Sequence, residues 1–175
     1  MPEQVIAVNM GQLEVSRRGG DVLAALGLGS CVAVCVYDPR VRMGGMIHVV
    51  LPSSAIGRER EGQAKFADLG VPRLVAAMVK EGGSRQRLRL VMAGGANVLS
   101  SMNHGSALDI GSRNVAAVLA ALETEKLSVW KSDVGGKTSR TVRLSVASGT
   151  VRVKTLRMGE KVLATLGGGN GQGSD

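Results

Sequence analysis

Two residues of this sequence have the chemistry of a nucleophile and its base. Cys31 follows Gly29–Ser30, and His48 follows Gly44–Gly45 in the next apolar run, with two residues between. A thiol is mostly protonated at neutral pH, and a neighbouring imidazole can accept its proton and form an ion pair. Glycine before the cysteine allows a tight turn whose N–H groups can point at a developing oxyanion. The pattern therefore indicates nucleophilic catalysis, with Gly29 and Ser30 as candidate supporting residues.

A predicted hairpin brings these two residues together. The run Val32–Tyr37 is apolar and rich in β-branched residues without alternation, which is typical of a strand buried on both faces. Asp38–Pro39–Arg40 is a turn signal, and the chain returns into a strand over Met46–Leu51. A turn centred on Pro39–Arg40 places Cys31 directly opposite His48, on the same face of the sheet.

Each of these residues also has a purely structural interpretation. A cysteine in an apolar strand is usually a small core residue, and a histidine beside it usually packs or forms hydrogen bonds. Cys35 lies in mid-strand without a glycine-containing loop beside it, which favours the structural interpretation. His104, between Asn103 and Gly105, is typical of a turn. Two cysteines and two histidines without CxxC or HxxxH spacing indicate neither a disulfide framework nor a zinc site.

The surrounding elements predict an α+β domain. Apolar spacing predicts a helix over Val71–Val79 and a second helix from about Ser112, which is its predicted N-cap. Ser53–Asp68 is predicted to be a surface loop. The predicted strands outside the hairpin are Val5–Val8, Leu13–Ser16, Val22–Leu28, Leu88–Ala93, Leu127–Val134, Thr141–Val146 and Val151–Leu156. This order predicts largely antiparallel or mixed sheets with two main helices, in one domain over residues 1–160. Residues 161–175 are predicted to be a glycine-rich, disordered tail.

The charge of the chain suggests an anionic partner. The 175 residues carry a net charge of +8, and residues 127–175 contribute eight Lys or Arg against three acidic residues. Only three aromatic residues are present, and no helix-turn-helix, RNP or zinc motif accompanies the charge, which disfavours a nucleic-acid partner. The alternating Arg85, Arg87 and Arg89 are interpreted as the solvated face of an edge strand.

No segment of the sequence has the pattern of a membrane span or a secretory signal. The longest strongly apolar stretch, Leu23–Asp38, is interrupted by Gly27, Gly29 and Ser30. The first residues lack a charged region followed by an apolar one. We therefore expect a cytoplasmic protein without membrane insertion.

Taken together, the motifs resemble those of the chemoreceptor glutamine deamidase family, CheD. The runs LGLGSCVAVCVYDP, from Leu26 to Pro39, and GGMIHVVLP, from Gly44 to Pro52, carry the most specific likeness. Further matches follow in order to about residue 157: Ala64–Asp68, Gly94–Ala96, Ile110–Val115, Asp133–Gly136 with Arg140, and Gly149 with Val151–Lys154. The resemblance implies a three-layer α/β/β sandwich. It also implies hydrolysis of the side-chain amide of particular receptor glutamines to glutamate and ammonia.

Position by position, the resemblance implies that Cys31 is the nucleophile and His48 the base of a reaction through a thioester, without a metal or organic cofactor. It also implies a threonine as third catalytic member, but Ala25 stands at that place, so the orienting group is unknown. A backbone carbonyl can orient an imidazole in its stead, and Ser30 is a more distant substitute.

The implied partners are the cytoplasmic domains of chemotaxis receptors and, where one exists, a CheC-type phosphatase. Because the threonine is missing, a non-catalytic chemotaxis binding module remains the alternative hypothesis. The basic excess is then interpreted as a docking face for an acidic receptor. Arg143, Arg152 and Lys154 are the positions that test it.

Overall fold

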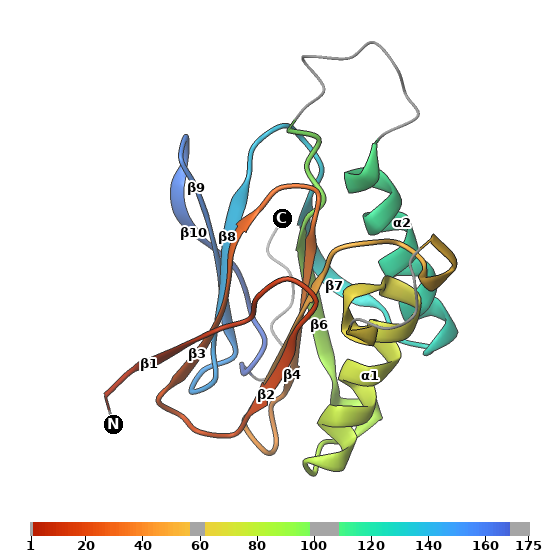
Figure 1. The fold of residues 1–175 in the computed structure, drawn as a ribbon. Helices are drawn as coiled ribbons and strands as arrows, with labels where there is room; N and C mark the ends of the chain where they lie inside the picture. The colour runs from red at the N-terminus through yellow and green to blue at the C-terminus, as the bar shows by residue number, and fades with distance from the viewer. Residues whose placement is uncertain (1, 57–61, 99–108, 169–175) are drawn as a thin grey trace.

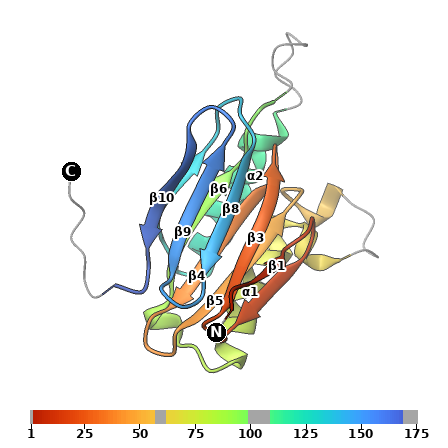
Figure 2. The ribbon, with the colours of Figure 1, turned by 90° about the vertical axis from the view of Figure 1, so that its left-hand side faces the viewer.

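The computed structural model describes residues 2–56, 62–98 and 109–168, which form three layers (Figure 1). Two five-stranded sheets pack face to face, and the two helices cover the outer face of one of them (Figures 1 and 2). The first sheet, in spatial order, contains β1 (Gln4–Ala7), β3 (Asp21–Leu28), β8 (Arg140–Ser145), β9 (Thr150–Thr155) and β10 (Gly159–Thr165). The second contains β2 (Leu13–Ser16), β5 (Met43–Val49), β4 (Val32–Asp38), β6 (Arg89–Gly94) and β7 (Val129–Val134). The helices are α1 (Ala67–Lys80) and α2 (Ile110–Thr124).

This architecture confirms the predicted α+β sandwich with two helices. The pairs β1–β3 and β6–β7 are parallel, and the other strand pairs are antiparallel, so both sheets are mixed. Within the described residues, no helix is long and apolar enough to cross a membrane.

The central strand β4 separates two apolar cores. Val32, Val34 and Val36 pack toward the helices, with Leu74 and Met78 of α1. The alternate residues of the same strand, among them Ala33 and Cys35, pack against the first sheet together with Cys31. All seven residues of β4 are buried, as the uninterrupted apolar run predicted.

Strand β5 begins three residues earlier than predicted, because Gly44 and Gly45 belong to the strand and not to the turn. Helix α1 crosses β5 closely at this point. A Cβ on Gly45 would lie 2.7 Å from Met78 Sδ and 3.1 Å from Leu74 Cδ1, so only glycine fits beneath the helix.

Three further expectations were wrong. The N-cap of α2 is Asp109, whose carboxylate accepts from the backbone N–H of Ser112, the residue predicted to be the cap. Part of the predicted loop Ser53–Asp68 forms short 3₁₀ turns at 54–56 and 63–65. An additional strand, β10, pairs with β9 over Gly159–Thr165, so the first residues of the predicted disordered tail, 161–165, belong to the sheet. The sequence around Gly159 allows a tight hairpin, which brings this polar strand back onto the sheet.

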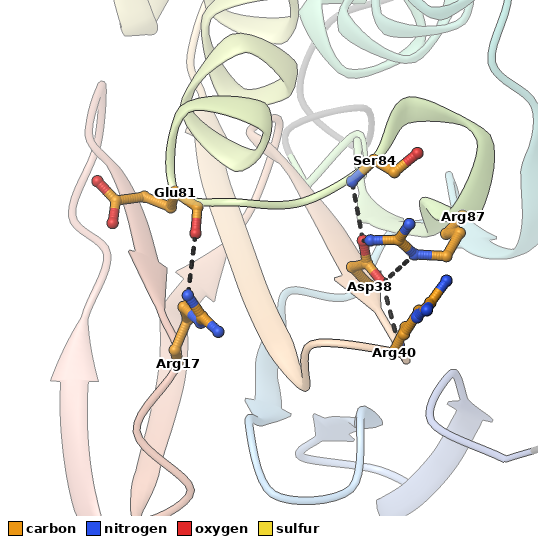
Figure 3. A network of polar contacts seen from close by, with 6 residues as sticks. All are labelled: Arg17, Asp38, Arg40, Glu81, Ser84 and Arg87. Carbon is orange, nitrogen blue, oxygen red and sulfur yellow. Dashed lines mark hydrogen bonds and ion pairs between the residues drawn. The ribbon is translucent and has the colours of Figure 1, made fainter.

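The arginine row is not the solvated face of an edge strand. Residues 85–87 form a 3₁₀ turn, and β6 lies inside the second sheet, between β4 and β7. Arg87 forms two hydrogen bonds with the buried carboxylate of Asp38, Nε–Oδ1 at 3.0 Å and Nη2–Oδ2 at 2.8 Å (Figure 3). The backbone N–H groups of Ser84 and Arg40 complete the set of donors to this carboxylate.

We expect Arg87→Ala to lower the free energy of unfolding by about 2 kcal/mol at pH 7. Removing one partner of a fully buried pair costs about 3–5 kcal/mol, and Arg87 is 32% exposed. Burial alone would raise the pKa of Asp38, but the hydrogen bonds from Arg87, Ser84 and Arg40 lower it. The contribution of the pair is therefore present above the pKa of an unfolded aspartate and is lost as pH falls through the lower folded-state value.

Denaturant titration of wild type and Arg87→Ala across this pH range measures the effect. The control is Arg85→Ala, which removes the more exposed pair with Glu125 and should cost at most about 1 kcal/mol. Equal costs for the two variants would contradict the assignment of Asp38 as the buried anchor of this turn.

Candidate active site

Cys31 lies at the end of a loop that joins the two sheets. The loop follows an irregularity in β3, where the register with β8 shifts between Ala25 and Leu28, and β4 begins at Val32. The carbonyls of Gly29 and Cys31 accept hydrogen bonds from the N–H groups of Ala96 and Gly95, both at 2.8 Å. This contact requires glycine beside it, because a Cβ on Gly94 would collide with the carbonyl oxygen of Cys31.

The predicted register of the hairpin was wrong by two residues. His48 pairs with Ala33, and the last pair before the turn is Asp38 with Met43. The turn is therefore longer than predicted, and it closes through Arg42 in the left-handed region at φ 49°. Because side chains alternate with a period of two, a shift of two residues leaves Cys31 and His48 on the same face. They are diagonal neighbours, and between these two described side chains no hydrogen bond forms in the resting structure.

The imidazole of His48 is oriented by a backbone carbonyl. Nδ1 lies 2.9 Å from the oxygen of Val8 in a buried contact. A carbonyl can only accept, so Nδ1 carries the proton and Nε2 of the neutral ring keeps its lone pair. Val8 is held in turn by its own N–H, which donates to Ala24 on β3 at 2.8 Å.

The backbone of His48 is fixed as firmly as its ring. Its N–H donates to Gln12 at 3.0 Å, and its carbonyl accepts from Gly11 at 2.9 Å. Ala25, at the place of the expected threonine, is fully buried in the core between the sheets and has no polar group to offer. The carbonyl of Val8 therefore supplies the orienting contact. Side-chain motifs could not identify it, because any residue type carries this group.

Burial disfavours the charged forms of both side chains. Cys31 is 9% exposed and His48 is 4% exposed. Burial raises the pKa of the Cys31 thiol, an effect that a hydrogen bond from its own backbone N–H partly offsets. Burial also lowers the pKa of His48, against the opposing effect of the hydrogen bond to Val8. The resting pair is therefore a neutral thiol and a neutral imidazole, unlike the ion pair expected from the sequence.

Cys35 has a different environment. It is 1% exposed, and burial raises the pKa of its thiol to about 12. Such a thiol is inert at neutral pH, which agrees with the structural interpretation of this residue. His104 lies outside the described residues. Among the described residues, no three His, Cys, Asp or Glu side chains gather as metal ligands would.

Asn114 on α2 joins the loop of Cys31 to the end of the His48 strand. Its Nδ2 donates to the carbonyls of Ser30 and Val50, each at 2.9 Å, and its side chain is fully buried. Its Oδ1 has no partner among the described residues. The two donated bonds tie the cysteine loop to the residue after β5, and the unpaired acceptor is a cost to the free energy of folding at this position. The motif Ile110–Val115 signalled this residue as part of the resemblance, but not its task.

A cavity of about 220 Å³ opens beside the cysteine loop. It is lined by Gly29, Ser30, Ile110, Gly111 and residues 96–98. The lining is mostly backbone and small side chains, so a flexible side chain such as a glutamine can approach the loop there.

Comparison with known proteins places this chain in a family. The family model described as "CheD chemotactic sensory transduction" matches residues 50–155. A protein of Symbiobacterium thermophilum named "Probable chemoreceptor glutamine deamidase CheD" is 47% identical over 158 residues, covering 90% of this chain and 96% of its own. Proteins of the same name are 39% identical in Desulfitobacterium hafniense, over 91% of this chain and 98% of theirs, and in Archaeoglobus fulgidus, over 89% and 96%.

Among solved structures, the hypothetical protein YfiH of Bacillus licheniformis aligns with 53% of this chain and 36% of its own at TM-score 0.35 and 18% identity. A similarity of this size does not establish a shared fold. The relatives, in contrast, match nearly end to end at high identity. This chain therefore belongs to the CheD family of chemoreceptor glutamine deamidases.

Proposed function

We propose that this protein is a cysteine-dependent glutamine deamidase that acts on the cytoplasmic domains of chemotaxis receptors. The observation that carries the proposal is that Cys31 directly precedes β4 and packs into the same core as Ala33, the strand partner of His48, while Nδ1 of the imidazole is bonded to Val8. That bond leaves Nε2 as a base. The names of the relatives supply the substrate class, a glutamine of a chemoreceptor. We place the reaction in the cytoplasm, where thiols stay reduced.

The first half of the proposed reaction forms a thioester. Nε2 of His48 accepts the Sγ proton of Cys31 while the sulfur attacks the amide carbon of the glutamine. The C–S bond forms, and the carbonyl electron pair moves to oxygen. The C–N bond then breaks, and the imidazolium gives its proton to the leaving nitrogen, which departs as ammonia. Because the resting thiol is neutral, proton transfer accompanies attack, and the bound substrate must bring the two diagonal side chains together.

The second half hydrolyses the thioester. Nε2 of His48 accepts a proton from water, and the hydroxide attacks the thioester carbon. The C–S bond breaks, the thiolate recovers the proton from the imidazolium, and glutamate leaves. The chemistry needs no cofactor, since every proton moves through the one imidazole.

The backbone of the cysteine loop is the proposed oxyanion site. Among the described residues, no acceptor pairs with the N–H group of Ser30, and the N–H of Cys31 bonds to the sulfur of the same residue. The carbonyls of Gly29, Ser30 and Cys31 are all bound. Fixing the carbonyls leaves the Ser30 N–H available on a rigid loop, and the Cys31 N–H can join it once the sulfur has attacked the substrate. A preorganised donor of this kind contributes about 10²–10³ in rate.

The test is incubation of the purified protein with a purified receptor cytoplasmic fragment, followed by peptide mass spectrometry. Conversion of specific glutamines to glutamate supports the proposal. Its absence, in a preparation that still binds the fragment, favours the alternative of a non-catalytic binding module that engages a receptor or a CheC-type phosphatase. Ala25 in place of a threonine is the observation that favours this alternative.

We expect Asn114→Ala to lower kcat by about 10–100-fold with a smaller change in KM. It removes both bonds that hold the cysteine loop to the end of β5, and small misplacements of a nucleophile cost about this much. The matched control is Val118→Ala, a fully buried position one helical turn further along α2. Both variants should lose stability, but only Asn114→Ala should lose kcat. Equal kcat values in the two variants would reduce Asn114 to a packing residue.

A further inference from the structure

A groove with a strong positive charge lies at the same end of the molecule as Cys31. Its volume is about 260 Å³, and it runs between the loop joining β7 to β8 and the hairpin of β9 and β10. Figures 1 and 2 show this loop and this hairpin at the end of the sandwich where β3 ends and α2 begins. Four basic side chains line it: Lys137, Arg140, Arg157 and Lys161.

One carboxylate balances only part of this charge. Asp133 lies 3.0 Å from Nε of Arg140 and 2.8 Å from Nζ of Lys161. Burial alone would raise the pKa of Asp133, but the hydrogen bonds and charges of Lys161 and Arg140 lower it, so it stays ionised. Within the described residues no acidic group pairs with Lys137 or Arg157, both of which are exposed. The groove therefore keeps an excess of three positive charges.

Short backbone contacts connect the groove to the cysteine loop. Asn97 donates its N–H to the carbonyl of Gly136 in the groove at 2.8 Å. The neighbouring N–H of Ala96 is bound to Gly29, and Arg140 pairs with Leu28 across β3 and β8. Because Asn97 lines the cavity beside the cysteine loop and Gly136 lines the groove, the two hollows are direct neighbours.

Apolar side chains border the groove. Met158 lines it and is 78% exposed, and Leu156 in the same turn is 95% exposed. Exposed apolar side chains beside charged ones are typical of a surface that binds another protein, and a nucleic acid would not need them.

We propose that this groove docks an acidic, partly apolar segment of the protein substrate and so presents a neighbouring glutamine to Cys31. Lys137 and Arg157 pair with carboxylates of the segment, and Leu156 and Met158 cover its apolar side. The inference rests on the proposed function, whose substrate is a protein.

The sequence alone suggested a different docking face, at Arg143, Arg152 and Lys154. These residues line a hollow of about 250 Å³ on the first sheet, where Glu3 and Glu160 offset much of their charge. Arg143 lies opposite Arg152, and Lys154 lies opposite Glu160. This face provides a matched control, because reversing two of its charges changes the net charge as much as reversing two in the groove.

The experiment compares Lys137→Glu/Arg157→Glu with Arg152→Glu/Lys154→Glu. Binding to a receptor cytoplasmic fragment is measured at low and high salt, with the deamidation rate and the alkylation of Cys31 by iodoacetamide. The groove variant should bind about tenfold more weakly at low salt, with a smaller loss at high salt. Its Cys31 should alkylate at the wild-type rate, and the control variant should bind as wild type does.

Equal losses of fragment binding in the two double variants, or a loss of binding in the control variant alone, would contradict the proposed docking role of the groove. A competition experiment with random-sequence duplex DNA provides a second test. If the DNA displaces the fragment from the wild-type protein but not from the groove variant, the groove binds nucleic acid and the proposal is wrong. If the wild-type protein shows no deamidation, and the groove variant still binds the fragment more weakly, the proposed function is wrong but the docking role of the groove is supported. If deamidation proceeds, and the charge reversals at Lys137 and Arg157 change neither binding nor the deamidation rate, the docking role of the groove is wrong and the proposed function is supported.

Discussion

Replacing Cys31 by alanine should reduce deamidation of a receptor fragment by at least about 10³-fold, because no other described nucleophile can form the acyl intermediate. Cys31 directly follows Gly29 and Ser30, which line the cavity, and directly precedes β4, which pairs with the strand of His48. Cys31→Ser is the sharper variant, since it keeps the size of the side chain and exchanges a nucleophilic sulfur for a hydroxyl of much higher pKa. It should be nearly as inactive as Cys31→Ala.

The control is Cys35→Ala. Cys35 lies four residues further along, within β4, and faces the same core as Cys31, but it is closed off between the sheets. Its loss should reduce stability, since it leaves a small cavity, and should leave kcat close to that of wild type at a temperature where the variant is folded. Peptide mass spectrometry of the fragment measures both rates. If activity survives in Cys31→Ala but not in Cys35→Ala, Cys35 is the nucleophile and Cys31 is the core residue, which contradicts the proposal.

The second large effect is expected at His48. His48→Gln keeps a polar side chain of similar length but removes the base, and should lower kcat/KM by about 10²–10⁴-fold. The structure also determines the direction of the pH effect. Burial lowers the pKa of His48, and the neutral ring is the active form. Activity should therefore persist to a lower pH than an ordinary histidine would allow, and should fall only below that shifted pKa.

The pH profile of kcat/KM measures this expectation. The acid limb should lie below the ordinary imidazole value of about 6.5, and it should disappear in the residual activity of His48→Gln. At high pH, activity should fall only above the thiol pKa, which burial raises, because an ionised thiol no longer supplies the proton that His48 passes to the leaving nitrogen. An acid limb at or above the ordinary histidine value would contradict a buried neutral base.

The candidate catalytic residues could be predicted from the sequence, but the strand register that positions them could not. Residue types and the glycines around them pointed to Cys31 and His48, and alternation placed both on one face. The register depended on the length of the turn. Asp38 binds the N–H of Arg40, and Arg42 adopts a left-handed conformation, which lengthens the turn and moves the partner of His48 to Ala33. Nothing in local sequence distinguishes this turn from the shorter one.

The groups that position the site come from distant segments. The carbonyl of Val8 is forty residues from His48, and Asn114 is more than eighty from Ser30. Such contacts follow from the packing of β1, β3 and α2, which no short motif specifies. The same holds for Arg87, whose alternation with Arg85 and Arg89 resembled an exposed strand although its guanidinium binds the buried Asp38.

The central claim is that the amide carbon passes through a covalent bond to Cys31, and rapid quenching in acid tests it most directly. Wild-type protein is mixed with a receptor fragment, quenched during the first turnovers, digested and analysed by mass spectrometry. The account predicts a substrate glutamine that has lost ammonia and is joined to the peptide carrying Cys31, in an adduct that hydroxylamine cleaves. Glutamate formed at the full rate with no such adduct, and formed equally by Cys31→Ala, would contradict it.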